Sequence, residues 1–186
     1  MERSMTLILG GARSGKSHYA QELVKRSGQT ALFVATATAL DEEMRARIAA
    51  HRAARPADWQ TLEAPLQAGE AIRKAEPTDW VLLDCLTLLA SNILLALPEP
   101  VQESAFDALL DEELDSLMEV FANSRAKWVI VSNEVGLGLV PPYPLGRFFR
   151  DGLGRANQRL AQIADTVLFM AAGIPMAIKG ELPKQH

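Results

Sequence analysis

Cysteine is almost absent from this chain of 186 residues, in which Cys85 is the only one. A single thiol cannot form an internal disulfide, so the composition favours a reducing compartment. The first ten residues, "MERSMTLILG", lack the apolar stretch and the small-residue cleavage site of a secretory signal peptide. We therefore expect a cytoplasmic protein.

An excess of positive charge and long apolar runs are also missing. The net charge is -4 and the isoelectric point is about 5.4, which argues against nucleic acid or an anionic membrane surface as the main partner. The longest apolar run, residues 86–97, is interrupted by Ser91 and Asn92 and is shorter than the roughly 20 residues that span a bilayer. This run predicts a buried helix and no stable membrane insertion.

No repeat, low-complexity tract or Gly/Ser linker divides the sequence. With 48% hydrophobic residues, a chain of this length buries one sizeable core and is too short for two ordinary ones. We expect a single domain over residues 1–186.

Short apolar runs alternate with longer segments that are typical of helices. Because each run resembles a strand buried on both faces, the pattern predicts the α/β class, with a mostly parallel central sheet flanked by helices. The runs are residues 5–9, 31–35, 80–83, 128–131 and 167–170. A last apolar piece, residues 176–178, follows the tight turn "AGIP" and predicts an antiparallel C-terminal edge strand.

A surface loop is expected at residues 98–104, followed by an amphipathic helix. Acidic side chains occupy one side of that helix, and an apolar stripe occupies the other. The stripe consists of Phe106, Leu109, Leu110, Leu114, Leu117, Val120 and Phe121.

The stretch "GGARSGKS" at residues 10–17 fits the phosphate-binding pattern G-x-x-x-x-G-K-[ST], between the first expected strand and a helix. Glycines allow successive backbone N–H groups to converge on phosphate oxygens at the positive end of a helix. In this interpretation Lys16 reaches the β- and γ-phosphates and the Ser17 hydroxyl binds Mg²⁺. A glycine-rich turn that carries GKS by chance is the plainer alternative. The motif predicts a P-loop NTPase-like fold with a nucleoside triphosphate site, and it leaves the reaction open.

Asp84 ends the apolar run "WVLLDC", where P-loop proteins carry the carboxylate that holds Mg²⁺ directly or through water. A second interpretation is an acidic N-cap of the helix that follows. The two interpretations are compatible.

His51, one of only three histidines, continues an apolar stripe at helical spacing, which predicts that its side chain points inward. The preceding members of the stripe are Leu40, Met44 and Ile48. Spacing alone favours a structural histidine at a helix C-terminus, where the dipole stabilises imidazolium. Arg52 and Arg55 nearby either attract an anion or are solvated surface charges. A catalytic role for His51 therefore stays open at this point.

Two further segments are unusually polar. Residues 132–144, "SNEVGLGLVPPYP", follow an expected strand and form either a functional loop or an ordinary connection. Residues 146–165 carry four arginines, and these can contact phosphates or a polar substrate, face solvent, or contact a neighbouring subunit.

Five stretches of the sequence together carry a family resemblance. They are, in order, "LILGGARSGKS", "DEEMRARIAAHRAARPADWQTLEAP", "LLDCLTLLASNIL", "SNEVGLGLVP" and "FRDGLGRANQRLAQIADTVLFMAAGIPMAIK". The chain thereby resembles the bifunctional adenosylcobinamide kinase / adenosylcobinamide-phosphate guanylyltransferase family. The resemblance implies a transferase of cobalamin biosynthesis that phosphorylates adenosylcobinamide with ATP or GTP. It then transfers GMP from GTP to that phosphate, which gives adenosylcobinamide-GDP and pyrophosphate.

The resemblance also implies roles for particular residues. In this family a histidine before an Arg-Pro carries GMP covalently, and here that position is His51; neutral imidazole is a suitable nucleophile near pH 7. Lys16 would be the second catalytic residue, and Ser17 and Asp84 would hold Mg²⁺. The implied nucleotide contacts are Gly10, Gly11, Ala12, Arg13, Ser14, Gly15, Lys16, Ser17, Val34, Ala35, Thr36, Arg52, Ala53, Ala54, Arg55, Glu63 and Asp84. Alanines stand at 53 and 54 where some relatives have Asp-Gly, so contacts there would run through the backbone.

Relatives form ring-like homo-oligomers, so the resemblance further implies a homo-oligomer, a trimer. Two other functions stay open on the residues themselves. One is a P-loop kinase of another small alcohol with a structural His51, and the other is a nucleotide-binding regulatory subunit with slow hydrolysis. The sequence does not select ATP or GTP as phosphate donor and assigns no general base for the kinase step.

Overall fold

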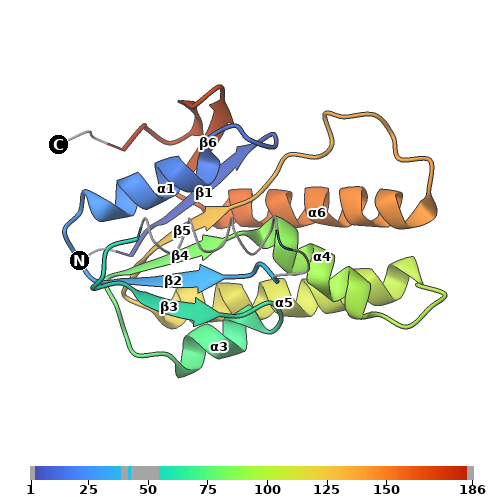
Figure 1. Ribbon diagram of the computed structural model, residues 1–186, viewed down its shortest axis with the longest axis horizontal. Helices are drawn as coiled ribbons and strands as arrows, with labels where there is room; N and C mark the ends of the chain where they lie inside the picture. The colour runs from blue at the N-terminus through green and yellow to red at the C-terminus, as the bar shows by residue number, and fades with distance from the viewer. Residues whose placement is uncertain (1–2, 39–41, 43–54, 184–186) are drawn as a thin grey trace.

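A seven-stranded sheet forms the centre of the computed structural model, which describes residues 3–38, 42 and 55–183 (Figure 1). The strand order is β3-β2-β4-β5-β1-β6-β7, and every neighbouring pair is parallel except β6 and β7. The strands are β1 Met5–Gly10, β2 Ala31–Ala35, β3 Gln60–Glu63, β4 Trp80–Asp84, β5 Lys127–Val131, β6 Thr166–Ala171 and β7 Ile174–Lys179.

The predicted architecture is confirmed, with one strand added. The five apolar runs all lie in strands, and β7 is the expected antiparallel edge strand. The sequence pattern does not predict β3, because "QTLE" is short and largely polar and occupies the other edge of the sheet, where most of its side chains are exposed. The fold is P-loop NTPase-like, with the phosphate-binding sequence between β1 and the helix that follows.

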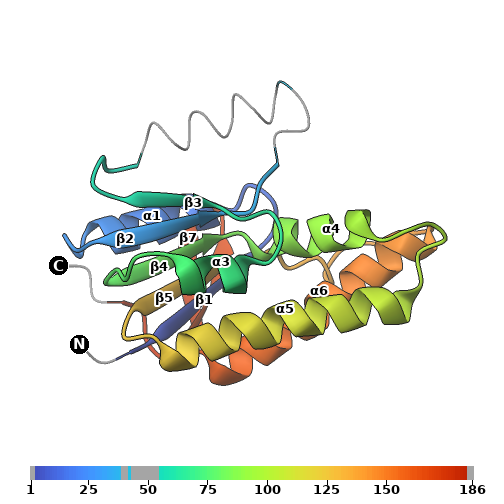
Figure 2. The ribbon, with the colours of Figure 1, turned by 90° about the horizontal axis from the view of Figure 1, so that it is seen from below.

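The helices of the described residues cover the two faces of the sheet unequally. They are α1 Lys16–Lys25, α3 Ala68–Lys74, α4 Leu86–Ala96, α5 Glu103–Asn123 and α6 Pro144–Ile163. Figure 2 shows α1 on one side of the sheet and α5 and α6 on the other. Because side chains alternate along a strand, Leu7 of β1 packs on the α6 side and Ile8 on the α1 side. Within the described residues, no helix is long and apolar enough to cross a membrane.

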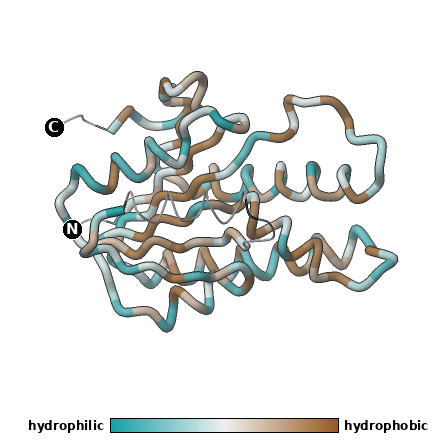
Figure 3. Tube along the Cα trace, viewed as in Figure 1, coloured by the Kyte–Doolittle hydropathy of each residue, from teal (hydrophilic) through white to brown (hydrophobic). Residues whose placement is uncertain are grey.

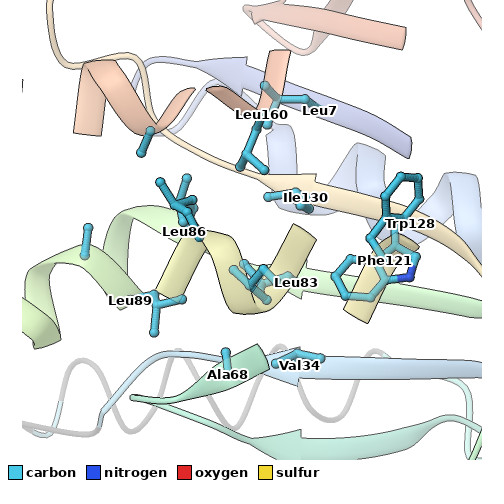
Figure 4. Packing of buried hydrophobic residues seen from close by; sticks show 14 of the residues in the cluster. Leu7, Val34, Ala68, Leu83, Leu86, Leu89, Phe121, Trp128, Ile130 and Leu160 are labelled. Atoms are coloured by element: carbon cyan, nitrogen blue, oxygen red, sulfur yellow. The ribbon is translucent and has the colours of Figure 1, made fainter. Parts of the chain in front are cut away.

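The larger hydrophobic core lies between the sheet and helices α3 to α6 (Figure 4). Leu83, Ile130 and Leu160 are fully buried there, and each such side chain contributes about 1.5–3 kcal/mol through its removal from water. Phe121 of α5 meets Trp128 of β5 edge to face, with 5.8 Å between ring centroids. Figure 3 shows the central strands as continuous hydrophobic stretches, whereas hydrophilic residues recur along the helices.

Two details of the sequence expectations for α5 are corrected. The helix begins at Glu103, so the predicted loop at 98–104 ends before residue 103; an acidic side chain in the first turn complements the helix dipole. Leu109, expected in the buried stripe, is 43% exposed. Glu113 is buried instead, because its carboxylate Oε1 accepts a hydrogen bond from the N–H of Gly69 at the start of α3 (2.9 Å).

Candidate active site at the carboxyl edge of the sheet

The strand register brings the predicted nucleotide contacts to one edge of the sheet. Ala35, at the end of β2, pairs with Glu63 of β3 and with Asp84 of β4. Asp84 in turn pairs with Val131, which pairs with Ile8 of β1. The carboxyl ends of the four strands β3, β2, β4 and β5 therefore lie in a row beside the loop that follows β1. Ligands in open α/β sheets bind at this edge.

Residues 10–15 form a tight phosphate-loop conformation between β1 and α1. Gly10 and Gly15 have positive φ angles of 151° and 92°. A Cβ atom on Gly10 would lie 2.5 Å from the carbonyl oxygen of Met170, so a side chain would clash with β6. The N–H of Gly173, in the β6–β7 turn, donates to the carbonyl of Ser14 (3.0 Å) and braces the loop from outside. Gly15 is the N-cap of α1, so the free N–H groups of the first turn of α1 face the loop.

The Lys16 ammonium lies inside the curve of this loop, and the residue as a whole is only 7% exposed. Its Nζ donates to the carbonyl oxygen of Gly11 (2.6 Å) and lies 3.4 Å from Ser14 Oγ. Burial lowers the pKa of Lys16, and electrostatic interactions with the nearby Cys85 and Asp84 side chains oppose that change. An anion bound in the loop would offset the desolvation of this cation.

Ser17 and Asp84 form the second part of the site. The Ser17 hydroxyl donates to Asp84 Oδ1 across 3.0 Å. Asp84 is the last residue of β4 and the N-cap of α4 is Cys85, with no side-chain cap hydrogen bond, so the N-cap interpretation of Asp84 is wrong. A hydroxyl and a carboxylate side by side are hard oxygen donors of the kind Mg²⁺ prefers. Among the described residues no three His, Cys, Asp or Glu side chains cluster, and this pair fits a magnesium ion whose other ligands are phosphate oxygens and water.

Thr36, directly after β2, locks the end of that strand to the end of β4. It is fully buried, and its Oγ1 donates to the carbonyl of Cys85 (2.7 Å) and accepts from the Cys85 N–H (2.8 Å). The N–H of Thr36 also donates to the carbonyl of Asp84 (3.3 Å). Thr36 therefore fixes the distance between Ala35 and Asp84.

Asn92 on α4 is a site residue that the sequence reasoning missed. Its Nδ2 donates to the carbonyl of Thr36 (2.8 Å) and to the carbonyl of Pro65 (2.9 Å). One side-chain amide thus ties the segment after β2 to the segment after β3, where Glu63 lies. The available signal was an amide within the apolar run at 86–97.

Arg55 is the part of the histidine segment that the structure describes. Its guanidinium lies over the Phe33 ring, 3.4 Å from the centroid, and donates to Thr61 Oγ1 (3.3 Å). Arg55 is half-buried on the α1 side of the sheet, so it is not the fully solvated surface charge that was one of the two expectations from the sequence. His51, Arg52, Ala53 and Ala54 lie outside the described residues.

The loop after β5 contacts the phosphate loop. The N–H of Glu134 donates to the carbonyl of Gly10 (3.0 Å), and the N–H of Asn133 donates to Thr87 Oγ1 (2.7 Å). Asn157 of α6 donates to the carbonyl of Asn133 (3.1 Å). The start of the polar loop at 132–144, directly after β5, therefore belongs to the candidate site.

The arginines of α6 have separate partners. Arg159 binds Asp111 (2.7 Å) and Asp115 of α5, and Arg155 binds Asp107. Arg147 donates to the carbonyl of Pro142 (2.9 Å) in the preceding loop. These contacts give Arg147, Arg155 and Arg159 partners within the chain.

Comparison with known proteins shows the family. A model of the family "cobinamide kinase / cobinamide phosphate guanyltransferase" matches residues 6–178. The chain belongs to this family. The resemblance expected from the sequence is thereby confirmed.

Curated relatives of the cobinamide kinase / guanyltransferase family match along nearly the whole chain. The bifunctional adenosylcobalamin biosynthesis protein CobP of Pseudomonas aeruginosa is 45% identical, over 94% of this chain and 97% of its own length. The corresponding CobU proteins are 42% identical in Salmonella typhimurium and 41% identical in Escherichia coli, each over 94% of this chain and 99% of the relative.

Two solved structures match at much lower identity. A KaiC-like protein from Pyrococcus horikoshii is 14% identical with a TM-score of 0.49, over 90% of this chain and 71% of its own. The RadB recombinase is 13% identical with a TM-score of 0.48, over 89% and 73%.

Proposed function

We propose that this chain is a bifunctional transferase that phosphorylates adenosylcobinamide with ATP or GTP and then transfers GMP from GTP to the new phosphate, releasing pyrophosphate. Membership of the cobinamide kinase / guanyltransferase family over residues 6–178 carries this proposal. The phosphate loop and the Ser17–Asp84 pair support it, because both reactions need a bound triphosphate. One domain, residues 1–186, serves both reactions.

The phosphate loop, residues 10–17, binds the triphosphate through its backbone N–H groups. Lys16 gives up its contact with the Gly11 carbonyl and places its charge on the β- and γ-phosphates. A magnesium ion held by Ser17 and Asp84 would supply charge neutralisation on the phosphates when bound. In the kinase reaction the acceptor hydroxyl oxygen bonds to the γ-phosphorus while the bond to the bridging oxygen breaks, and the nucleoside diphosphate leaves.

The ends of β2 and β3 contact the rest of the nucleotide. Val34, Ala35 and Thr36 lie at the same edge as the phosphate loop, and Glu63 places an exposed carboxylate beside them. Arg55 adds positive charge on the α1 side, and the backbones of 52–54 complete the contact. The phosphate-binding motif and the family support these contacts.

His51 is the nucleophile of the guanylyl step. Its imidazole nitrogen attacks the α-phosphorus of GTP, forms an N–P bond and expels pyrophosphate. An oxygen of adenosylcobinamide phosphate then attacks the same phosphorus, and the imidazole leaves as the product forms. Two displacements replace one, so GMP is held on the protein until the second acceptor arrives.

The test uses GTP labelled at the α-phosphate, with Mg²⁺, followed by denaturation of the protein. Acid-labile, alkali-stable label on the wild-type chain, lost in His51→Ala and retained in the control His18→Ala, supports the guanylyl-histidine. Lys16→Ala should abolish labelling and reduce the kinase rate by about a thousandfold. A wild-type chain that phosphorylates adenosylcobinamide but never takes up label is a kinase alone. A chain with no cobinamide turnover is a nucleotide-binding regulator.

The cytoplasmic location and the homotrimer stay predictions. The trimer is checked by light scattering of the purified chain. A monomer that catalyses both reactions at full rate would contradict it.

A further inference from the structure

A cavity of about 520 Å³ lies beside the phosphate loop, between the loop after β5 and the middle of α6. The nucleotide sites proposed above do not use it. Its walls are apolar at Leu9 and polar at Glu134, Arg150, Asn157 and Gln158. It therefore combines a few convergent polar groups with an apolar base, as small-molecule sites do.

Backbone contacts connect this cavity with the catalytic edge. Leu9 is the residue before Gly10, and the N–H of Glu134 donates to the carbonyl of Gly10 (3.0 Å). In the sheet, β5 lies between β4, which ends in Asp84, and β1, which leads into the phosphate loop. A molecule in the cavity therefore contacts Leu9 and Glu134, the two residues that lead to Gly10 of the phosphate loop.

Asn157 is the buried polar group of the cavity wall. Its side chain is 4% exposed, and its Nδ2 donates to the carbonyl of Asn133 (3.1 Å). Its Oδ1 is buried and has no hydrogen-bond partner in the described part of the chain. Since buried acceptors in native proteins are normally paired, this oxygen points to a ligand that donates an N–H or O–H.

We propose that this cavity binds the hydroxyl-bearing arm of the phosphoryl acceptor, with Asn157 Oδ1 accepting an N–H from an amide group of that acceptor. This inference rests on the proposed function, which makes the acceptor an alcohol carried on a cobinamide rich in amides. Glu134 offers a second acceptor, and Arg150 and Gln158 offer donors to amide carbonyls. The cavity is too small for a whole corrinoid, so it takes the arm and leaves the macrocycle outside.

The test compares two cavity variants with a matched control on the same helix. Asn157→Leu removes the unpaired acceptor together with the Nδ2 hydrogen bond to the Asn133 carbonyl, whereas Gln158→Ala shortens an exposed cavity residue without disturbing the core. Gln162→Ala, an exposed glutamine one turn further along α6 and outside the cavity, is the control. The measurements are KM for adenosylcobinamide and for ATP in the kinase reaction, binding of adenosylcobinamide by absorbance titration, and covalent labelling by GTP.

Asn157→Leu should raise KM for adenosylcobinamide about tenfold and Gln158→Ala about threefold, and Gln158→Ala should leave KM for ATP and labelling by GTP unchanged. The dissociation constants from titration should rise in parallel, and Gln162→Ala should match the wild type. Unchanged acceptor KM in both variants overturns the inference while leaving the proposed function intact. A change in oligomeric state without a change in acceptor binding also overturns it, since the cavity is then a subunit contact. A wild-type chain with no kinase activity on cobinamide is the separate failure of the proposed function.

Discussion

The Ser17 hydroxyl donates a hydrogen bond to the Asp84 carboxylate, with 3.0 Å between Oγ and Oδ1. The two residues come from the start of α1 and the end of β4. Their contact joins the phosphate loop to β4, the strand that ends in the carboxylate of the proposed metal site.

Asp84→Asn tests this metal site. The amide keeps the size of the side chain and can still accept from Ser17, but it removes the negative charge that attracts Mg²⁺. We expect the Mg²⁺ concentration for half-maximal kinase activity to rise about tenfold, and the maximal rate to fall by about tenfold or more. The measurement is a magnesium titration of the kinase rate. Asp111→Asn, at an exposed aspartate of α5, is the control, and an unaltered titration of Asp84→Asn would remove Asp84 from the metal site.

Asn92→Ala tests the tie between the segments after β2 and β3. The variant loses two hydrogen bonds to partly buried carbonyls, so Thr36 and the segment carrying Glu63 are no longer held together. We expect KM for GTP to rise about tenfold and the free energy of unfolding to fall by about 1–3 kcal/mol. Ser91→Ala, at the preceding residue of α4, should change neither quantity. Lower stability with an unchanged KM for GTP would show that Asn92 only supports the fold.

Glu113 gives the stability of the chain a specific pH dependence. Burial raises the pKa of Glu113, and hydrogen bonds from the N–H groups at the start of α3 partly oppose this. Because the pKa of Glu113 is raised in the folded state, the protonated side chain stabilises the fold. This stabilisation is fully present below the ordinary glutamate pKa and is lost as the pH rises through the pKa of the folded state.

Glu113→Gln imitates the protonated side chain and does not titrate. Its stability relative to wild type should therefore increase as the pH rises from about 4 to about 7. Urea unfolding at several pH values measures this difference. Glu112→Gln, at the exposed neighbouring position, should show no such trend. Glu113→Ala should be about 2 kcal/mol less stable than Glu113→Gln at every pH, because neither side chain titrates and alanine leaves the buried Gly69 N–H without its acceptor.

Cys85 should be a poor nucleophile in the folded chain. Burial, reinforced by the neighbouring Asp84 charge, raises the pKa of the Cys85 thiol to about 11. At pH 8 about one thiol in a thousand is then ionised, so alkylation by iodoacetamide should be at least about a hundredfold slower than in urea. Because the chain has one cysteine, total label by mass spectrometry measures this residue directly. Equal rates in folded and unfolded chains would contradict the raised pKa of the thiol.

Local patterns were enough for most of the architecture. The five buried strands are continuous apolar runs, and the phosphate loop is a short motif whose glycines are required by its own backbone conformation. Strand β3 escaped prediction because an edge strand with exposed side chains carries no apolar run. The exposure of Leu109 and the burial of Glu113 differ from the prediction because helical spacing defines the edges of a buried stripe only approximately. At the edge of the α5 stripe, the hydrogen bond from the N-terminus of α3 decides that Glu113 is buried.

For the candidate site, the sequence by itself determined the P-loop, the carboxylate after β4 and the family, since each depends on residues that are neighbours in the chain or recur in order along it. Only the tertiary structure decided that Asp84 contacts Ser17 rather than capping α4, and that Asn92 ties Thr36 to Pro65. The same holds for the cavity beside Asn157. These contacts join residues from separate elements, and their distances follow from strand register and helix packing, which no local pattern specifies.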